Sequence, residues 1–407
     1  MHLRIEDVAQ LARNASERVL EAAARVRATE AEADATFGEV FLPKIDAVAS
    51  YWRSDRQLEV TTQLGPLRVA SHDLGFEMVR ATQPLLDVAD FFYRYGAERA
   101  AVDVARLAAV RAADVAELSA IRAFYAILSR REEIGALERS VHVLESHVTD
   151  ARHLFAAGRV PENDVTKVEL ELSRRQQALL VTRHREREAT LELLAALALP
   201  PETPLTIEAP GAAPDAAPAP LPQLVARALD ARPDLRALAA ADHRLELLAA
   251  AWTADYVPRV QAFVDYQYDV NDAFQDNDAF EGGVQAQVRL FDGLAREHRR
   301  AEVRAQREVL ASRRRDLERR VAIEVERARL AVEEQRSALA VAERSIAQAE
   351  ASLRVEDDLY RHDKSAAAAV LDSELKLVES RVDAAHARYG TLAAAAALKV
   401  ATGGGSP

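Results

Sequence analysis

Three histidines on one stretch of the chain are the first side chains whose type could bind a metal ion. His142, His147 and His153 are separated by five and six residues. Two ligands on one helix bind a metal best at a spacing of four, because such residues lie on the same face. The spacing argues against a metal site, and we expect no cofactor.

Adjacent carboxylates and a basic run are the other candidates for chemistry. The pairs Glu132–Glu133 and Asp357–Asp358 are neighbours in sequence, so they splay apart on a helix and favour a solvated surface. Acidic residues interrupt the basic run at Ser312–Arg320, and the formal net charge is −12, which disfavours nucleic acid as a partner. The sequence has no serine-hydrolase elbow, P-loop, zinc-protease or dinucleotide motif, so we expect no enzyme.

The elements that position these residues are predicted to be long helices. Proline is absent between Pro84 and Pro161 and between Pro258 and Pro407, whereas eight prolines fall within 200–222. Because proline breaks helix interiors, the gaps permit very long helices and the cluster predicts a linker.

The chain has no cysteine, which excludes disulfides and a lipid-bearing cysteine. No apolar run approaches the roughly 20 residues of a membrane helix. We see no signal peptide in "MHLRIEDVAQ", which favours a cytosolic chain or a processed or trimmed one.

The two halves of the chain repeat one pattern. At an offset of 205 residues Phe155 meets Tyr360 and Val165 meets Val370, while "FLPKI" at 41–45 matches "YVPRV" at 256–260 with a larger offset. We therefore predict a tandem duplication. The predicted first repeat spans 1–199: a helix, a β-hairpin at about 43–84, a long helix at about 88–152, a turn at 155–164 and a helix at 165–199. A proline-rich linker follows at 200–222. The predicted second repeat spans 223–400: a helix, a hairpin at about 259–291, a long helix at about 293–359, a turn at 360–369 and a helix at 370–400. A flexible tail is predicted at 401–407.

Apolar residues in the long helices follow a heptad spacing. Such stripes are typical of coiled-coil seams. A helix over 88–152 would be about 98 Å long at 1.5 Å per residue, which indicates a rod or the wall of a tube. The three stripes are Ile134, Leu137, Val141, Leu144, Val148, Ala151 and Phe155; Leu339, Ala342, Ile346, Ala349, Leu353 and Tyr360; and Leu371, Leu375, Val378, Val382, Ala385 and Tyr389.

Short segments before the long helices alternate apolar and polar residues. Residues 259–270 and 281–291 have this pattern, and 44–53 and 73–82 carry a noisier version. A period of two predicts strands, so each half contributes a hairpin. A β-barrel with lipid outside and water inside needs such an alternation.

These features together resemble the TolC-type outer-membrane efflux proteins over nearly the whole chain. The resemblance rests on "ARPDL", "YVPRV", "RLFDG", "FAAGRVPENDV" and "LYRHDKSAAAAVLDSELKL". It implies a mainly α fold with a small β part, in which antiparallel coiled-coil helices form a periplasmic α-barrel. It also implies a homotrimer whose three sets of four strands make one twelve-stranded transmembrane β-barrel in outer-membrane lipid. A periplasmic adaptor and an inner-membrane transporter are the implied partners.

The resemblance also implies roles for residues in the two turns. Asp164 and Tyr360 occupy positions of a link between turns that holds the mouth shut, and Asp372 occupies the position of a ring that narrows the pore. Ala369 replaces the second ring residue. Asp372 as a solvent-facing residue and Tyr360 as a heptad core residue are the alternatives. The turn residues expected to dock the adaptor are Phe155, Gly158, Arg159, Val160, Asp363, Lys364 and Ser365, of which Gly158 permits a positive φ.

The sequence thus predicts a passive exit duct of a tripartite efflux or type I secretion system. The main alternative is a soluble structural coiled-coil protein, which would not need four alternating strand segments. A periplasmic adaptor with a helical hairpin is a weaker alternative, because adaptors lack the duplicated pattern of hairpin and long helix.

Overall fold

The structure, a computed structural model, describes residues 1–55, 58–70, 72–209, 218–269, 278–362 and 367–404. The chain divides into two compact units, and each takes segments from both predicted repeats. Unit 1 comprises Met1–Ala23, Leu107–Arg236 and Arg315–Pro407, and unit 2 comprises Ala24–Arg106 and Ala237–Arg314.

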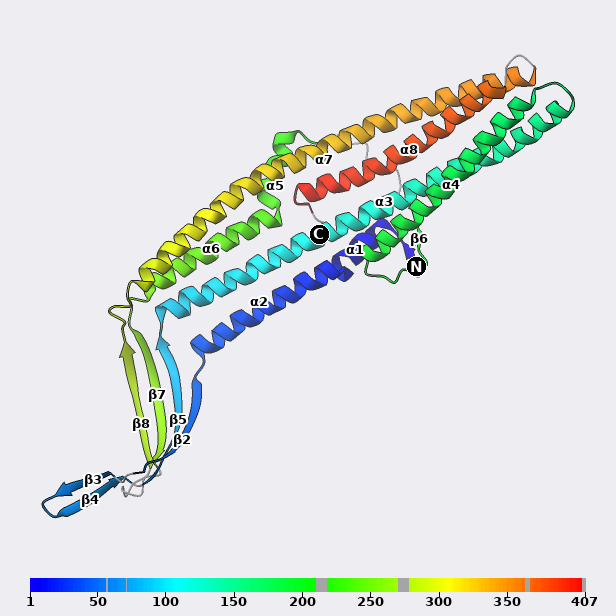
Figure 1. The fold of residues 1–407 in the computed structure, drawn as a ribbon. Helices are drawn as coiled ribbons and strands as arrows, with labels where there is room; N and C mark the ends of the chain where they lie inside the picture. The colour runs from blue at the N-terminus through cyan, green and yellow to red at the C-terminus, as the bar shows by residue number, and fades with distance from the viewer. Residues whose placement is uncertain (56–57, 71, 210–217, 270–277, 363–366, 405–407) are drawn as a thin grey trace. The chain divides into compact units, whose positions relative to one another are not determined.

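Unit 2 contains one four-stranded antiparallel sheet with the order β2-β5-β7-β8 (Figure 1). Because β5 pairs with β7, the hairpins of the two repeats join into a single sheet. A smaller hairpin of β3 and β4 lies between β2 and β5 in sequence. The prediction of strand up to Phe291 was wrong, since β8 ends at Gln287. The strands are β2 (Lys44–Arg53), β3 (Leu58–Thr62), β4 (Gly65–Ala70), β5 (Asp73–Leu86), β7 (Arg259–Asp269) and β8 (Asp278–Gln287).

One face of this sheet is apolar and uncovered in the single chain. The register places Val79 between Ala47 and Tyr266, and these three side chains therefore share a face. On the same face Ile45 is 73% exposed and Val284 is 67% exposed. An exposed apolar face of this kind needs lipid or protein to cover it.

The two edges of the sheet are β2 and β8. Each pairs with one neighbour among the described residues, β2 with β5 and β8 with β7. Since the four strands alternate in direction, β2 and β8 run in opposite directions. The β2 edge of one copy can therefore pair with the β8 edge of another and continue the antiparallel pattern.

Helices continue unit 2 beyond the sheet. Ion pairs join α2 to α3 through Glu30 and Arg106 (2.6 Å), and α6 to α7 through Asp242 and Arg307 (2.8 Å). A π-helical segment, Ala89–Arg94, precedes α3 and stacks Phe91 on Phe41 of α2 with ring centroids 4.9 Å apart. The helices are α2 (Glu17–Phe41), α3 (Tyr95–Ala156), α6 (Pro233–Ala254) and α7 (Ala295–Arg361).

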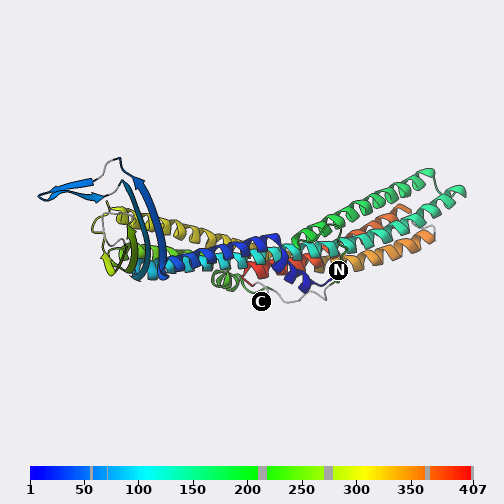
Figure 2. The ribbon, with the colours of Figure 1, turned by 90° about the horizontal axis from the view of Figure 1, so that it is seen from below.

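Unit 1 is helical, and α3, α4, α7 and α8 run side by side within it (Figure 2). The heptad stripes are buried where these helices meet: Leu144 and Val148 of α3 pack with Val165 of α4, and Leu137 packs with Val378 of α8. The seams predicted from the sequence are thus present. The remaining helices are α1 (Ile5–Ala15), α4 (Glu162–Ala196), α5 (Leu221–Ala231) and α8 (Ala367–Ala401).

The segment predicted as a proline-rich linker contains a strand that the sequence analysis missed. Strand β6 (Thr206–Ile207) pairs in parallel with β1 (His2–Leu3), and the N-terminal amine donates to the Pro204 carbonyl at 2.8 Å. Leu3 belongs to the core cluster around Phe124 of α3. Among the described residues, no helix combines the length and apolar character needed to cross a membrane.

Candidate functional site

The turn between α3 and α4 begins with a glycine cap on α3. Arg159 N–H donates to Leu154 O at 2.9 Å, and Gly158 N–H donates to Phe155 O at 2.8 Å. These two bonds form a Schellman motif, which needs a left-handed residue at the position of Gly158. Gly158 has φ +71°, a conformation that glycine adopts without steric cost. The positive φ predicted at this position is present.

The residues predicted to dock an adaptor are exposed where the structure describes them. Phe155 is 45% exposed, Gly158 and Arg159 are exposed, and Val160 is partly buried. Phe155 lies in the last turn of α3, because this helix continues to Ala156 and α4 begins at Glu162. The turn itself is therefore shorter than the predicted 155–164. Asp363, Lys364 and Ser365 lie outside the described residues.

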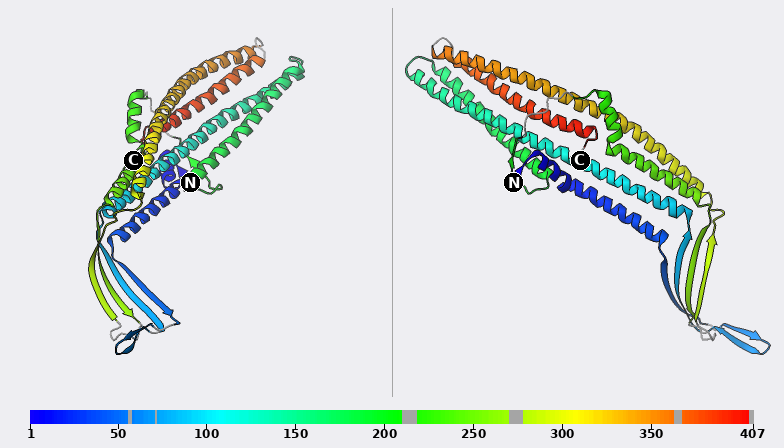
Figure 3. Two further views of the ribbon diagram at one scale, coloured as in Figure 1. Left: turned by 60° about the vertical axis from the view of Figure 1, so that its left-hand side comes forward. Right: turned by 180° about the vertical axis from the view of Figure 1, so that it is seen from behind.

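The residues predicted to link the two turns lie at one end of unit 1, where α3 and α7 end and α4 and α8 begin (Figure 3). Asp164 lies in the first turn of α4 and accepts a hydrogen bond from Lys167 Nζ at 3.2 Å. Tyr360 is partly buried. It lies within α7, which continues to Arg361, so the turn does not begin at 360 as predicted. The Lys167 pair means that a link to another turn must compete with a contact inside α4.

Asp372, predicted to narrow the pore, is exposed on α8. Its side chain is 57% exposed, and it forms an ion pair with Lys376 one helical turn later. Ala369 is partly buried, one turn before Asp372. Lys376 was missed in the sequence analysis, although a spacing of four on a helix could have identified it. A ring of Asp372 side chains would thus carry a partly compensated charge.

The second face of the sheet carries a row of charged side chains. The register aligns Asp46 of β2, Arg80 of β5, Asp265 of β7 and Glu281 of β8. Arg80 donates twice to Asp265, from Nε at 2.7 Å and from Nη2 at 2.6 Å. One row of charges thus crosses this face, which also carries apolar side chains such as Phe76 and Met78 of β5, whereas the opposite face is mainly apolar. A mainly apolar face and a face with charges suit a barrel between lipid and water.

Comparison with known families favours one of the predicted classes. Residues 224–404 match the outer membrane efflux protein family. The resemblance predicted from the sequence is confirmed for this part of the chain. The matched region contains most of α5 and the whole of α6, β7, β8, α7 and α8, which are the elements of the predicted second repeat.

Solved structures share the fold over nearly the full length of both chains. The outer membrane protein VceC of Vibrio cholerae is 16% identical with a TM-score of 0.78, and the match covers 99% of this chain and 97% of that one. CusC is 14% identical with a TM-score of 0.81, covering 98% and 92%. The CmeC outer membrane channel of Campylobacter jejuni is 12% identical with a TM-score of 0.79, covering 98% and 86%. No curated protein matches the chain.

A polar layer crosses unit 1 at a place that the sequence analysis did not single out. Glu133 of α3 accepts from Arg130 Nη1 at 2.6 Å and lies 3.1 Å from His386 Nε2 of α8. Burial opposes the charge of Glu133, but the contacts with His386 and Arg130 outweigh it and lower its pKa to about 2. The interpretation of Glu133 as solvated helix surface was wrong, since its side chain is 12% exposed.

The neighbouring Glu132 extends the same layer. Tyr389 of α8 donates its hydroxyl to Glu132 Oε1 at 2.8 Å, and Arg388 lies 3.2 Å from the same atom. Burial and the hydrogen bond to Glu132 raise the pKa of Tyr389 to about 12. The adjacent carboxylates do splay apart as predicted, but each reaches a different partner on α8, so both hold α3 against α8.

A second acid is buried near the turns. Glu374 of α8 is 8% exposed, and burial raises the pKa of its carboxyl, although charges on His147 of α3, Arg381 of α8 and Arg175 of α4 act in the opposite direction. His147 therefore lies near an acid. Among the described residues, no group of three or more potential ligands could hold a metal ion.

Proposed function

We propose that this chain is the outer-membrane exit duct of a tripartite efflux or type I secretion system. One observation carries the proposal: the four-stranded sheet has an exposed, mainly apolar face, a second face crossed by a row of charges, and two edges that run in opposite directions. Such a sheet is complete only when copies of it close into a barrel, because a barrel has no free edge and gives its apolar face to lipid.

The proposed assembly is a homotrimer. Four strands per chain in three copies make twelve strands, an even number that closes with antiparallel pairing throughout. The helices that follow the strands are 62 residues (α3) and 67 residues (α7) long. In the trimer they form the wall of a periplasmic α-barrel, through which small molecules or polypeptides pass without catalysis by the duct.

The proposed partners meet the duct at its turns. An adaptor docks on exposed residues of the α3–α4 turn, namely Phe155, Gly158, Arg159 and Val160, and on the second turn at Asp363, Lys364 and Ser365. Energy comes from an inner-membrane transporter, because no nucleotide-binding motif is found in this chain. Outer-membrane lipid covers the apolar face of the sheet.

The proposed mouth is formed by the same end of unit 1. Asp372 is the constriction residue, and Asp164 and Tyr360 link the turns in the closed state. The exposure of Asp372 on α8 supports a role in water, and its ion pair with Lys376 moderates its charge. In the closed state Asp164 would contact a neighbouring turn, and on opening it would return to its contact with Lys167.

Conductance in planar bilayers tests the proposal. The purified protein, added in detergent, should insert and give uniform conductance steps, and its mass in detergent should be that of three chains. A soluble coiled-coil protein is the rival. It would stay monodisperse without detergent and leave the bilayer silent, and that result would contradict the duct.

A further inference from the structure

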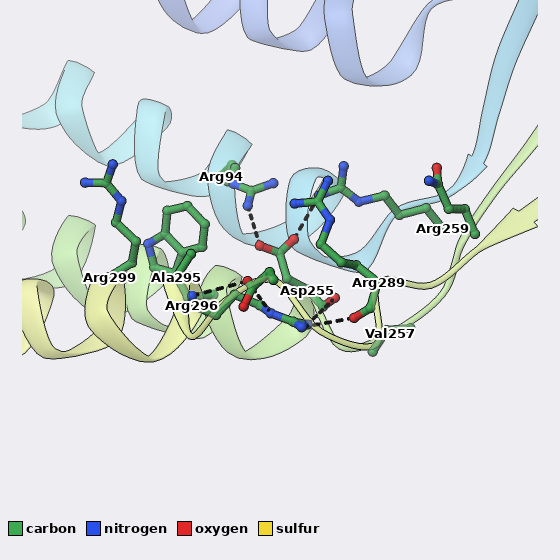
Figure 4. A pocket seen from close by; sticks show the side chains of 11 residues that line it. Arg94, Asp255, Val257, Arg259, Arg289, Ala295, Arg296 and Arg299 are labelled. Atoms are coloured by element: carbon green, nitrogen blue, oxygen red, sulfur yellow. Dashed lines mark hydrogen bonds and ion pairs between the residues drawn. The ribbon is translucent and has the colours of Figure 1, made fainter.

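A pocket in unit 2 lies where the strands meet the helices, and no role has been assigned to it above. It has a volume of about 200 Å³. The walls come from the π-helical segment, the end of α6, the start of β7, the segment after β8 and the first turns of α7 (Figure 4). Five arginines line the pocket against two acids. The arginines are Arg94, Arg259, Arg289, Arg296 and Arg299, and the acids are Asp255 and Asp292.

Most of these arginines already face an acid. Asp255 accepts from Arg94 Nη2 at 2.7 Å and from Arg259 Nη2 at 2.8 Å. Arg296 donates from Nε to Asp292 at 2.8 Å and lies 4.0 Å above the Tyr256 ring. Outside the pocket, Asp90 also pairs with Arg94, and Asp87 lies 3.2 Å from Arg259. Arg299 pairs with Glu302 at 2.8 Å, so four of the five arginines have an acidic partner that balances their charge.

Arg289 differs from the other four arginines of the pocket. Within the part of the chain that the structure describes, no acidic side chain pairs with Arg289, although its carbonyl accepts from Arg296 at 3.0 Å. Figure 4 shows the side chains of Arg289 and Arg259 reaching toward Asp255. Arg94 and Arg259 pair with Asp255, and Arg289 lines the same pocket without an ion pair to it. The guanidinium of Arg289 can therefore bind an anion, and its planar geometry matches a phosphate.

Apolar side chains follow Arg289 directly in the sequence and are exposed. Leu290 is 86% exposed, Phe291 is 75% exposed and Leu294 is 53% exposed. Leu294 also has φ +66°, a strained conformation for a leucine, next to Gly293 at φ +72°. This tight turn places an apolar surface beside a cationic pocket. A ligand that fits both has a phosphate at one end and hydrocarbon at the other.

We propose that this pocket binds the phosphate of an anionic glycerophospholipid, with Arg289 as the main contact and the acyl chains against Leu290 and Phe291. The lipid part of this proposal rests on the proposed outer-membrane location, because a strand-to-helix junction then lies at the headgroup level of the bilayer. Free phosphate shares the chemistry of the headgroup, but it makes no use of the apolar side chains.

The test measures lipid binding to the full chain by native mass spectrometry from detergent. Phosphatidylglycerol should bind to the wild type, whereas phosphatidylcholine, which carries no net charge, should bind at least about tenfold more weakly. Arg289→Gln should weaken phosphatidylglycerol binding by about tenfold, since it removes a charged hydrogen bond. Arg313→Gln is the matched control, because Arg313 is an exposed arginine of α7 outside the pocket. It should leave binding unchanged.

Two results would overturn the proposal. Equal binding by wild type and Arg289→Gln means that the pocket is not the site. Binding of inorganic phosphate at the same strength as phosphatidylglycerol, with Leu290→Ser and Phe291→Ser leaving both unchanged, means a site for a free anion and not for lipid. Conductance of the same preparation separates this outcome from failure of the proposed function: a duct that conducts but ignores phosphatidylglycerol refutes only the lipid site.

Discussion

The carboxylate of Glu133 on α3 and the imidazole of His386 on α8 lie in contact, with Oε2 3.1 Å from Nε2. The same carboxylate accepts from Thr182 of α4 through its other oxygen, also at 3.1 Å. One side chain thus joins three helices of unit 1. Because these contacts hold three helices together, we expect this polar layer to contribute to the stability of unit 1.

Replacing Glu133 should destabilise the protein in a pH-dependent way. The folded-state pKa of about 2 lies below the ordinary 4.5, so the folded state binds fewer protons than the unfolded state between these values. The contribution of ionised Glu133 to the free energy of unfolding is therefore complete above pH 4.5 and disappears as the pH falls toward 2. Glu133→Gln should lower the free energy of unfolding at pH 7 by on the order of 3 kcal/mol. Denaturant titration of wild type and variant in detergent, at several pH values, measures this difference in the free energy of unfolding.

Glu138→Gln is the control for this pH dependence. Glu138 is 49% exposed on the same helix and pairs with Arg183 at 2.7 Å, so its removal should cost little at any pH. If Glu133→Gln lowered the free energy of unfolding by the same amount at pH 7 and at pH 3, as is expected of Glu138→Gln, the polar layer would not depend on a charged Glu133.

A single substitution after α4 should stabilise the protein. Ala198 has φ +53° and occupies the position of a glycine cap, since Leu199 N–H donates to Leu194 O at 2.8 Å and Ala198 N–H to Ala195 O at 3.1 Å. A left-handed conformation costs an alanine about 1–2 kcal/mol. Ala198→Gly should therefore raise the free energy of unfolding by about 1 kcal/mol, and Gly158→Ala should lower it similarly. A lower melting temperature for Ala198→Gly would contradict the cap.

Arg13 of α1 should be essential for holding α1 on α3. It donates to Asp114 at 2.8 Å and to Glu117 at 2.7 Å, and both acids are almost completely buried. Removing one partner of a buried ion pair costs about 3–5 kcal/mol, so Arg13→Met should lower the melting temperature strongly. Arg18→Met, at an exposed position, should change stability by less than about 0.5 kcal/mol. Equal melting temperatures for the two variants would refute the role of Arg13.

The proposed constriction predicts opposite effects for two neighbours on α8. Asp372→Asn should reduce the preference for cations, measured as reversal potential in a salt gradient. Lys376→Gln should increase it, because Lys376 compensates Asp372 in the structure. Asp383→Asn, at an exposed position of the same helix, is the control. If Asp372→Asn and Asp383→Asn gave the same reversal potential as wild type, Asp372 would not line the constriction.

Much of the fold follows from local pattern, which explains why it could be predicted from the sequence. The period of two in the strand segments and the heptads through Leu144 and Val378 reflect burial on one face, and each pattern is readable within a few turns of chain. The pairing of β1 with β6 was missed, because two-residue strands leave no period and the contact joins residues about 200 positions apart.

The candidate sites were harder to predict for a similar reason. The spacing of Asp372 and Lys376 was visible in the sequence. The partners of Glu133 on α4 and α8 were not, because they lie 49 and 253 positions away. Sequence adjacency showed that Glu132 and Glu133 diverge, but not what each would meet. The arginine pocket is also assembled from distant segments, and only the charge of Arg289 is local information.

Closure of the sheet between copies is the central claim, and disulfide cross-linking tests it most directly. The chain has no cysteine, so any disulfide that forms must join the engineered cysteines. Ala49→Cys on β2 would be combined in turn with Phe280→Cys, Val284→Cys and Ala286→Cys on β8, all on the apolar face. Ser50→Cys, on the other face, is the control for each. We expect one of the Ala49 combinations to yield a covalent trimer under oxidation, on a non-reducing gel, and the Ser50 series to yield none. If membrane-inserted protein remained a single chain in every Ala49 combination, β2 and β8 of neighbouring copies would not pair, and the proposed barrel would be wrong.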